Sequence, residues 1–234
     1  MLESLFSKTF AILSLQLLIT WAATIYTINW FRDQYHQGKL GITASKNEAD
    51  ELDLHLGFDA IKPYFWTLLI VDIGVFLCLL FFGRHNILIG LPLFSIWSIL
   101  TGIELALALL SVDENLGAKV LAITCCITVG AALTGIYSGI DFAFLGPILF
   151  WSLIALLLGN IARLIFSIPR AKQRVMAVFG CVIFTGYLLY DFDRLAQASK
   201  EQDYNNWPVA MDFAIDIYLD IINLFLENLD LMSD

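Results

Sequence analysis

Long apolar stretches separated by short polar segments dominate this sequence. A helix needs about 20 mostly apolar residues to cross roughly 30 Å of hydrocarbon. Stretches close to that length cover residues 10–30, 64–82, 87–110, 118–140, 143–165, 174–192 and 209–229. The pattern predicts an all-α membrane protein with seven transmembrane helices, in which residues 1–234 form a single transmembrane domain.

Connections between the predicted helices are short except for the polar segment from Phe31 to Lys62, which is rich in Lys, Asp and Glu. We expect a surface loop with an interfacial helix in this segment. The first apolar stretch follows Lys8 and lacks a clear small-residue cleavage site, which favours a retained helix over a signal peptide.

The last apolar stretch differs from the others because it carries a row of acids and one amide. These side chains recur every three or four residues, at Asp212, Asp216, Asp220, Asn223, Glu227 and Asp230. A helix aligns such positions on one face. A carboxylate at the centre of a bilayer costs roughly 3 kcal/mol on insertion scales. This acid stripe must therefore face protein or water, where it can act as a track or sensor for cations and protons.

Other charges lie inside the predicted helices. Asp72 and Glu104 fall mid-way along the second and third helices, and the same cost leaves them either buried against a partner or lining an ion pathway. Arg84 ends the second helix and Arg163 lies near the end of the fifth. Long cationic side chains at such positions can reach the headgroups and anchor the helix.

Composition narrows the function further. Apolar residues make up 59% of the chain and charged residues 15%, with a mean hydropathy of +0.77, values outside the range of an ordinary soluble domain. The net charge of −9 comes without a basic stripe, which argues against nucleic-acid binding. The four cysteines and three histidines have no metal or redox spacing. We expect no resident cofactor and no enzymatic activity.

Two segments near the C-terminus carry a recognisable pattern. The sixth helix ends in Gly-Tyr-Leu-Leu-Tyr-Asp at 186–191, and the seventh contains Tyr-Leu-Asp-Ile-Ile-Asn-Leu-Phe-Leu at 218–226. Together they resemble the C-terminal signature of the Bax-inhibitor-motif family, the TMBIM proteins, in its bacterial branch. Residues 101–105 resemble the family's third-helix segment. Residues 144–149 resemble the start of its fifth helix, with Pro147 where a second glycine is usual.

The resemblance implies a fold in which two three-helix layers surround a central C-terminal helix. It also implies a pH-sensitive passive calcium leak channel, in which two hydrogen-bonded aspartates act as the proton sensor and gate. Asp191 and Asp220 match those positions, and they would contact calcium transiently. Arg84 matches an arginine that latches onto the pair when the pore is shut. A second-helix acid of the family's pathway falls within one residue or so of Asp72.

Elementary electrostatics supports such a sensor. Two carboxylates about 5 Å apart repel by roughly 3 kcal/mol at an effective dielectric of about 20. A shared proton relieves the repulsion, so the pair titrates as a coupled unit whose charge can bias a gate. Calcium favours carboxylate and carbonyl oxygens in flexible arrangements. The predicted ion pathway therefore includes further oxygen-bearing side chains, namely Asp216, Asn223, Glu227, Asp72 and Glu104.

Two other functions remain open at this point. Presenilin-like aspartyl proteases also pair two intramembrane aspartates, one of them in a Tyr-Asp helix end like Tyr190-Asp191. However, no glycine precedes Asp220, and Pro208-Val209-Ala210 replaces the expected Pro-Ala-Leu. The other alternative is a regulatory membrane protein, since some relatives are described as modulators of a membrane-bound AAA protease or as suppressors of cell death. The expected partners are thus the lipid bilayer, calcium and such a protease, in a bacterial inner membrane.

Overall fold

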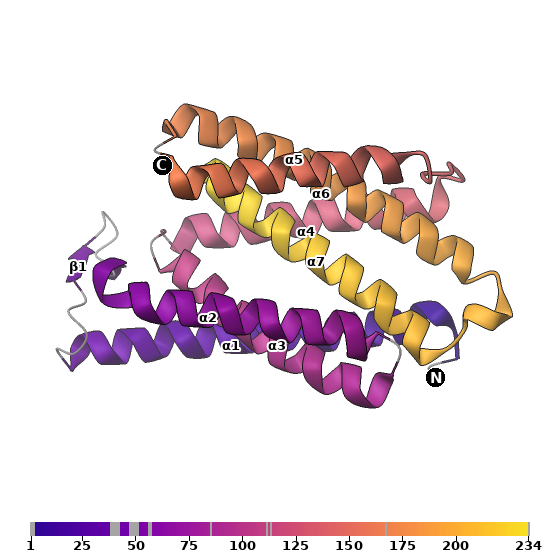
Figure 1. Cartoon of the computed structure of the whole chain (residues 1–234), viewed down its shortest axis with the longest axis horizontal. Helices are drawn as coiled ribbons and strands as arrows, with labels where there is room; N and C mark the ends of the chain where they lie inside the picture. Colours follow the sequence, from indigo (N-terminus) through magenta and orange to yellow (C-terminus); the bar gives the residue numbers. More distant parts are fainter. Residues whose placement is uncertain are drawn as a thin grey trace. The chain divides into compact units, whose positions relative to one another are not determined.

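A computed structural model of the chain describes residues 3–37, 43–46, 52–55, 58–84, 86–110, 112, 114–166 and 168–233. Long helices dominate it: α1 (Leu5–His36), α2 (Phe58–Cys78), α3 (Ile87–Leu109), α4 (Glu114–Tyr137), α5 (Leu145–Ile165), α6 (Arg170–Ala198) and α7 (Trp207–Met232) (Figure 1). A π-helix, η1 (Leu79–Gly83), continues α2, and a short 3-10 helix, η2 (Gln202–Tyr204), precedes α7. The predicted all-α fold with seven long helices is confirmed.

Several helices extend beyond their predicted spans, and α6 is one of them. The sixth apolar stretch was expected to end at residue 192, but the helix continues to Ala198. It continues because Leu195 and Ala196 are still buried, although charged residues interrupt the apolar run. The start of α7 follows simple capping rules: Asn206 accepts a hydrogen bond from the Val209 N–H at 3.0 Å.

The segment between α1 and α2 contains two short strands, β1 (Thr43–Lys46) and β2 (Leu52–His55), which pair antiparallel with Thr43 opposite His55. The interfacial helix expected between Phe31 and Lys62 is wrong for the residues described there. A local reason is visible in Leu52-Asp53-Leu54-His55, because apolar and polar residues alternate as they do in a strand.

Six of the described helices are long and apolar enough to cross a membrane, judged by length and composition. They are α1, α3 and α6 over their whole lengths, Trp66–Gly83 from α2 and η1, and most of α4 and α5 as Asn115–Tyr137 and Leu145–Arg163. The acid stripe keeps α7 outside this apolar class. That α7 also crosses the membrane therefore stays a prediction.

The chain packs into two compact units. One comprises Met1–Thr9 with Leu116–Asp234, and the other comprises Phe10–Asn115. The single transmembrane domain and the arrangement of two layers around a central α7 stay predictions.

Within the Phe10–Asn115 unit, polar side chains join α1 to α3. The buried Gln16 side chain donates to Ser95 Oγ at 3.3 Å and accepts from Ser98 Oγ at 2.9 Å. Thr24 Oγ1 donates to the Gly102 carbonyl at 3.0 Å. A Cβ at Gly102 would come within 2.6 Å of a backbone oxygen of α1, so glycine permits this close approach. The segment 101–105 thus contributes to helix packing.

Within the other unit, α6 packs against both α5 and α7 (Figure 1). The fourth helix meets α6 closely at Gly135, where a Cβ would lie only 2.8 Å from the Leu189 carbonyl oxygen. The fourth helix also reaches α7, because the Asn228 amide donates to Thr124 Oγ1 at 3.3 Å. Each of the four helices α4–α7 is therefore tied to at least one other within this unit.

The first residues of the chain belong to the same unit and contact the connection between α6 and α7. Lys8 Nζ donates to the backbone and side-chain oxygens of Asn205, both at 2.9 Å. The Asn205 amide donates to the Glu3 carbonyl at 2.6 Å, and the Lys8 ammonium lies 5.9 Å from the centre of the Trp207 ring. We call these contacts the N-terminal clasp.

Asp230 gathers the ends of three helices. It accepts from Arg163 Nη1 of α5 at 2.8 Å and from Arg170 Nη1 of α6 at 2.7 Å. Arg170 Nη2 also donates to the Ser233 carbonyl at 2.6 Å. The interpretation of Arg163 as a simple headgroup anchor is therefore wrong, because its guanidinium is engaged in an ion pair.

The carboxyl group of Asp230 lies just beyond the predicted span 209–229. Burial alone would raise its pKa, but the hydrogen bonds and positive charges of Arg163 and Arg170 outweigh burial and hold the pKa below its usual value. The interactions that lower this pKa stabilise the folded state at pH values above the pKa of the same carboxyl group in the unfolded chain. This contribution is lost as the pH falls through the folded-state value.

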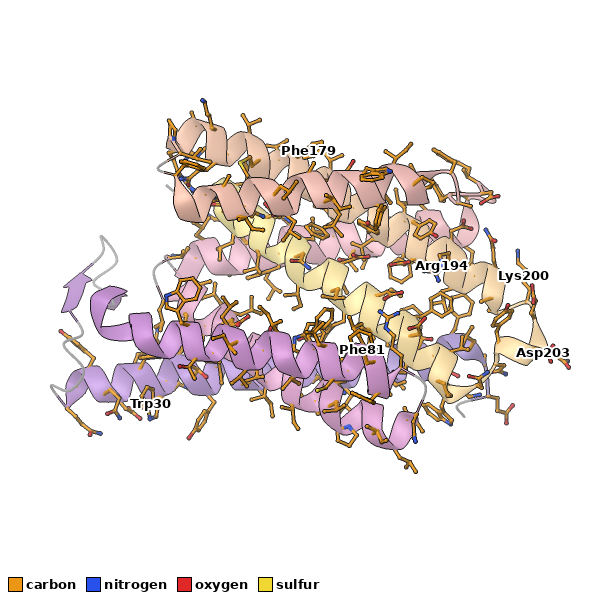
Figure 2. All side chains as sticks on the ribbon, in the orientation of Figure 1. Trp30, Phe81, Phe179, Arg194, Lys200 and Asp203 are labelled. Atoms are coloured by element: carbon orange, nitrogen blue, oxygen red, sulfur yellow. The ribbon has the colours of Figure 1, made fainter. Side chains whose placement is uncertain are left out.

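We predict that Asp230→Asn lowers the free energy of unfolding by about 1 kcal/mol at neutral pH, the upper range for partly exposed ion pairs. The deficit relative to the parent should shrink as the pH falls below the ordinary range of aspartate. Thermal unfolding in detergent micelles at several pH values measures both effects. Asp203→Asn, a change at an exposed residue of η2 labelled in Figure 2, is the control and should leave the midpoint unchanged. Equal effects of the two substitutions would contradict the prediction.

Candidate proton and cation site

Two buried aspartates meet where α6 packs against α7. Asp191 of α6 is 4% exposed and Asp220 of α7 is 6% exposed, and their carboxyl groups are hydrogen-bonded to each other. An ionised carboxylate can only accept hydrogen bonds, so this bond exists only when one of the two groups carries a proton. The structure thus brings together the two residues predicted as the proton sensor. Their role as a sensor stays a prediction.

Apolar neighbours fix the position of the pair. Leu188 and Phe192 on α6 and Ile217 and Leu224 on α7 are almost fully buried around these positions. Within the part of the chain that the structure describes, Asp220 Oδ2 is buried without a hydrogen-bond partner. A buried acceptor in this state costs free energy. A proton or a cation that reached this oxygen would therefore be stabilised there.

Asp216 and Arg194 extend the site. Arg194 Nη1 lies 3.1 Å from Asp191 Oδ1 and 3.7 Å from Asp216 Oδ2, and its side chain lies between α6 and α7 in Figure 2. We call Asp191, Asp216 and Asp220 the carboxylate site. The sequence reasoning missed Arg194 as a functional residue. Its spacing was the available signal, because a residue three positions after Asp191 lies on the same helical face.

The two tyrosines of the 186–191 segment have different surroundings. Tyr187 lies close enough to Asp191 and Asp220 to interact with both electrostatically. Tyr190 instead packs against Gly146 at the start of α5, where a Cβ would come within 3.3 Å of the tyrosine hydroxyl. The fifth-helix segment 144–149 therefore makes room for the end of α6 beside the carboxylate site.

Other residues of the acid stripe have partners outside the carboxylate site. None of its six side chains is exposed, as its insertion cost requires. The Asn223 amide donates to the Leu219 carbonyl of its own helix at 2.8 Å. Glu227, about 10 Å along the helix axis from Asp220, is hydrogen-bonded to Asn160 of α5. Asp220 and Glu227 therefore have partners on different helices, and the ion pathway along the stripe stays a prediction.

The other predicted site residues belong to the Phe10–Asn115 unit. Asp72 and Glu104 interact electrostatically across α2 and α3. Arg84 follows η1, and its N–H bonds to the Leu79 carbonyl five residues earlier at 3.1 Å, which is the π-helix pattern. The latch role of Arg84 and the pathway roles of Asp72 and Glu104 stay predictions.

Asp193 has a different environment from Asp191, as their angular separation on the helix predicts. It is buried, and its Oδ2 accepts from the Phe142 N–H and from Gln197 Nε2, both at 2.9 Å. Asp193 therefore ties the connection between α4 and α5 to α6. Among the described residues, no group of three or more His, Cys, Asp or Glu side chains is arranged to hold a metal ion.

Comparisons with known proteins agree with this architecture. Residues 2–234 match the family described as inhibitor of apoptosis-promoting Bax1. The chain is 27% identical to LIFEGUARD 2 of Arabidopsis thaliana over 98% of its own length and 87% of that protein. It is also 27% identical to LIFEGUARD 4 of the same plant, over 69% of this chain and 64% of that protein, which is less than two thirds.

A bacterial relative is similar to the same degree. An uncharacterized membrane protein of Streptococcus pyogenes serotype M6 is 27% identical over 62% of this chain and 63% of that protein. Together with the six long apolar helices, these matches identify the chain as a multi-pass integral membrane protein.

Asp193→Ala should destabilise the protein by about 1–3 kcal/mol, because the buried Phe142 N–H loses its acceptor. Asp193→Asn keeps an acceptor oxygen and should cost much less. Thermal unfolding of both variants in detergent measures the difference. Equal stabilities for the two variants would show that the hydrogen bond to Phe142 contributes nothing measurable.

Proposed function

We propose that this chain, which belongs to the Bax inhibitor family, lets calcium leak passively across a membrane and that Asp191 and Asp220 gate the leak in response to pH. One observation carries the proposal: two buried carboxyl groups from neighbouring helices hydrogen-bond to each other. Such a pair is stable only with a shared proton. Its charge therefore changes when that proton leaves.

A change of charge at this position can act as a gate. When the shared proton leaves, two buried carboxylates repel each other, and the contact between α6 and α7 becomes less favourable. The helices then shift toward an arrangement in which water or a cation reaches the carboxylates. A proton thus biases a two-state element, which is the general requirement for a pH switch.

Calcium is the cation that this chemistry favours. Its ligands are oxygens in flexible arrangements, and the carboxylate site offers three side chains of that kind. A leak requires binding that is strong enough to admit the ion and weak enough to release it. Asp191 and Asp220 would hold calcium only transiently, with Asn223, Glu227, Asp72 and Glu104 as further points along the pathway.

Arg84 would latch the pair in the closed state. The supporting observation is the π-helical turn at Leu79–Gly83 immediately before Arg84. Widened turns of this kind are frequent at functional sites. They also provide a local irregularity at which a helix end can change its direction without unfolding.

A regulatory role is compatible with the same fold. The family description, inhibitor of apoptosis-promoting Bax1, names an inhibitory activity, and binding to a membrane protease or to cell-death machinery needs no pore. Purified protein in liposomes that contain a calcium indicator separates the two roles. Calcium entry without any partner supports the leak, whereas entry no faster than in protein-free liposomes supports the regulatory role.

Asp220→Asn keeps the size and hydrogen bonding of the side chain but removes one titrating group from the pair. We therefore expect calcium flux into liposomes to lose its pH response in the window from about pH 6 to 8. Asp193→Asn is the matched control, since it removes a neighbouring buried carboxylate and keeps an acceptor for Phe142. A parental pH profile in Asp220→Asn, or a lost response in Asp193→Asn, would refute the aspartate sensor.

Arg84→Ala should raise the resting leak several-fold at the pH where the parent is closed, because the latch is lost. The same liposome assay measures this rate. Arg32→Ala, a change of another cation near a helix end of the same unit, is the control and should leave the resting rate unchanged. If the two substitutions have the same effect, Arg84 is an interfacial anchor and the latch is refuted.

A further inference from the structure

Arg194 gives the carboxylate site a cation of its own. One guanidinium nitrogen, Nη1, lies 3.1 Å from Asp191 Oδ1 and 3.7 Å from Asp216 Oδ2. The first carboxylate belongs to α6 and the second to α7, so the arginine bridges the two helices. The ion pair therefore uses oxygen atoms that a bound cation would also use.

Aromatic rings hold the guanidinium in place. Its central carbon lies 5.3 Å from the centre of the Tyr190 ring and 5.4 Å from the centre of the Phe213 ring, both within the range of cation–π attraction. A planar guanidinium suits such contacts better than an ammonium group does. Arg194 thus has a defined resting position between α6 and α7 (Figure 2).

The arginine is also able to leave that position. Its side chain is 41% exposed, whereas that of Asp191 is 5% exposed. The guanidinium can therefore move away from Asp191 without opening the core, and the buried carboxylate cannot follow it. A mobile cation beside fixed carboxylates is the arrangement expected for a tethered competitor.

Charge balance gives the arginine a specific role. Asp191 is surrounded by Tyr187, Tyr190 and Arg194 of its own helix and by Asp216 and Asp220 of α7. When the pair shares one proton, that proton and the guanidinium together offset two of the three negative charges of the carboxylate site. One unbalanced carboxylate charge then remains to attract a cation.

We propose that Arg194 is a tethered cation that occupies the carboxylate site in competition with a divalent cation. A cation with oxygen ligands enters only as the guanidinium withdraws from Asp191 and Asp216, so Arg194 sets how weakly the site holds the permeant ion. This inference rests on the proposed cation leak for its physiological meaning. The competition itself is a property of binding and can be measured without flux.

The test is cation binding to the full-length protein in detergent, with terbium(III) as the probe. Terbium is an oxygen-seeking stand-in for calcium, and tyrosines near the site sensitise its luminescence. Arg194→Gln removes the charge and keeps a polar side chain, so the half-saturating terbium concentration should fall about fivefold, the size expected for one partly exposed charge. Calcium should displace the probe from both proteins, at a correspondingly lower concentration in the variant.

Lys200→Gln is the matched control. Lys200 is an exposed cation just beyond the end of α6 and is labelled in Figure 2. Its substitution by glutamine removes the same charge as Arg194→Gln does, but farther along the chain from Asp191. Its half-saturating concentration should stay within about twofold of the parent, since exposed charges are screened. An unchanged affinity in Arg194→Gln, or an equal gain in Lys200→Gln, would overturn the proposal.

Arg194→Lys keeps the experiment decisive if Arg194→Gln does not fold. The lysine ammonium keeps the charge but reaches less far and stacks less well on the Tyr190 and Phe213 rings, so the half-saturating concentration should lie below that of the parent. A value equal to or above the parental one would overturn the proposal. Flux assays then separate the two ideas: tighter binding in the variant with no flux in the parent refutes the leak alone, and pH-dependent flux with unchanged binding refutes the tethered cation alone.

Discussion

A carboxylate that leaves water for the interior of a helical membrane protein must obtain a proton, a cation or a hydrogen-bond donor, and the acids of α7 meet this requirement in different ways. Asp220 shares a hydrogen bond with Asp191, which requires a proton. Asp216 contacts the guanidinium of Arg194. Glu227 is bonded to an amide of α5, and Asp230 accepts from two arginines. The packing of α5 and α6 against α7 follows from these needs.

These hydrogen bonds and ion pairs differ in how easily they can be broken. The ion pairs of Asp230 join three helix ends and include charges that cannot be neutralised near neutral pH, because arginine remains protonated there. They are suited to holding the helices together. The bond between Asp191 and Asp220 depends on one exchangeable proton, and the contact of Asp216 depends on a partly exposed side chain. Along one helix, a permanent attachment and a reversible one are separated by about three turns.

The sequence was sufficient for the helices, which follow from local patterns, and for the aspartate pair, which the resemblance of residues 186–191 and 218–226 to the family signature implied. Runs of about 20 apolar residues locate the helices, and a three- or four-residue spacing of acids locates the polar face of α7. It was not sufficient for the partners of those acids. The contact of Glu227 with Asn160, which lies 67 residues away in the numbering, depends on how distant helices pack. Arg194 could have been found from its spacing to Asp191, because a residue three positions later lies on the same helical face.

The N-terminal clasp has a consequence for the order in which the protein is made. Lys8 and the Asn205 that accepts its hydrogen bonds are 197 residues apart in the chain, yet both belong to one compact unit. Ribosomes add residues from the N-terminus onward at roughly 5–20 per second. Lys8 must therefore wait about 10–40 seconds after its own synthesis, until the connection before α7 has been made, before it can take up its final contacts. A segment that is synthesised early thus reaches its final position late.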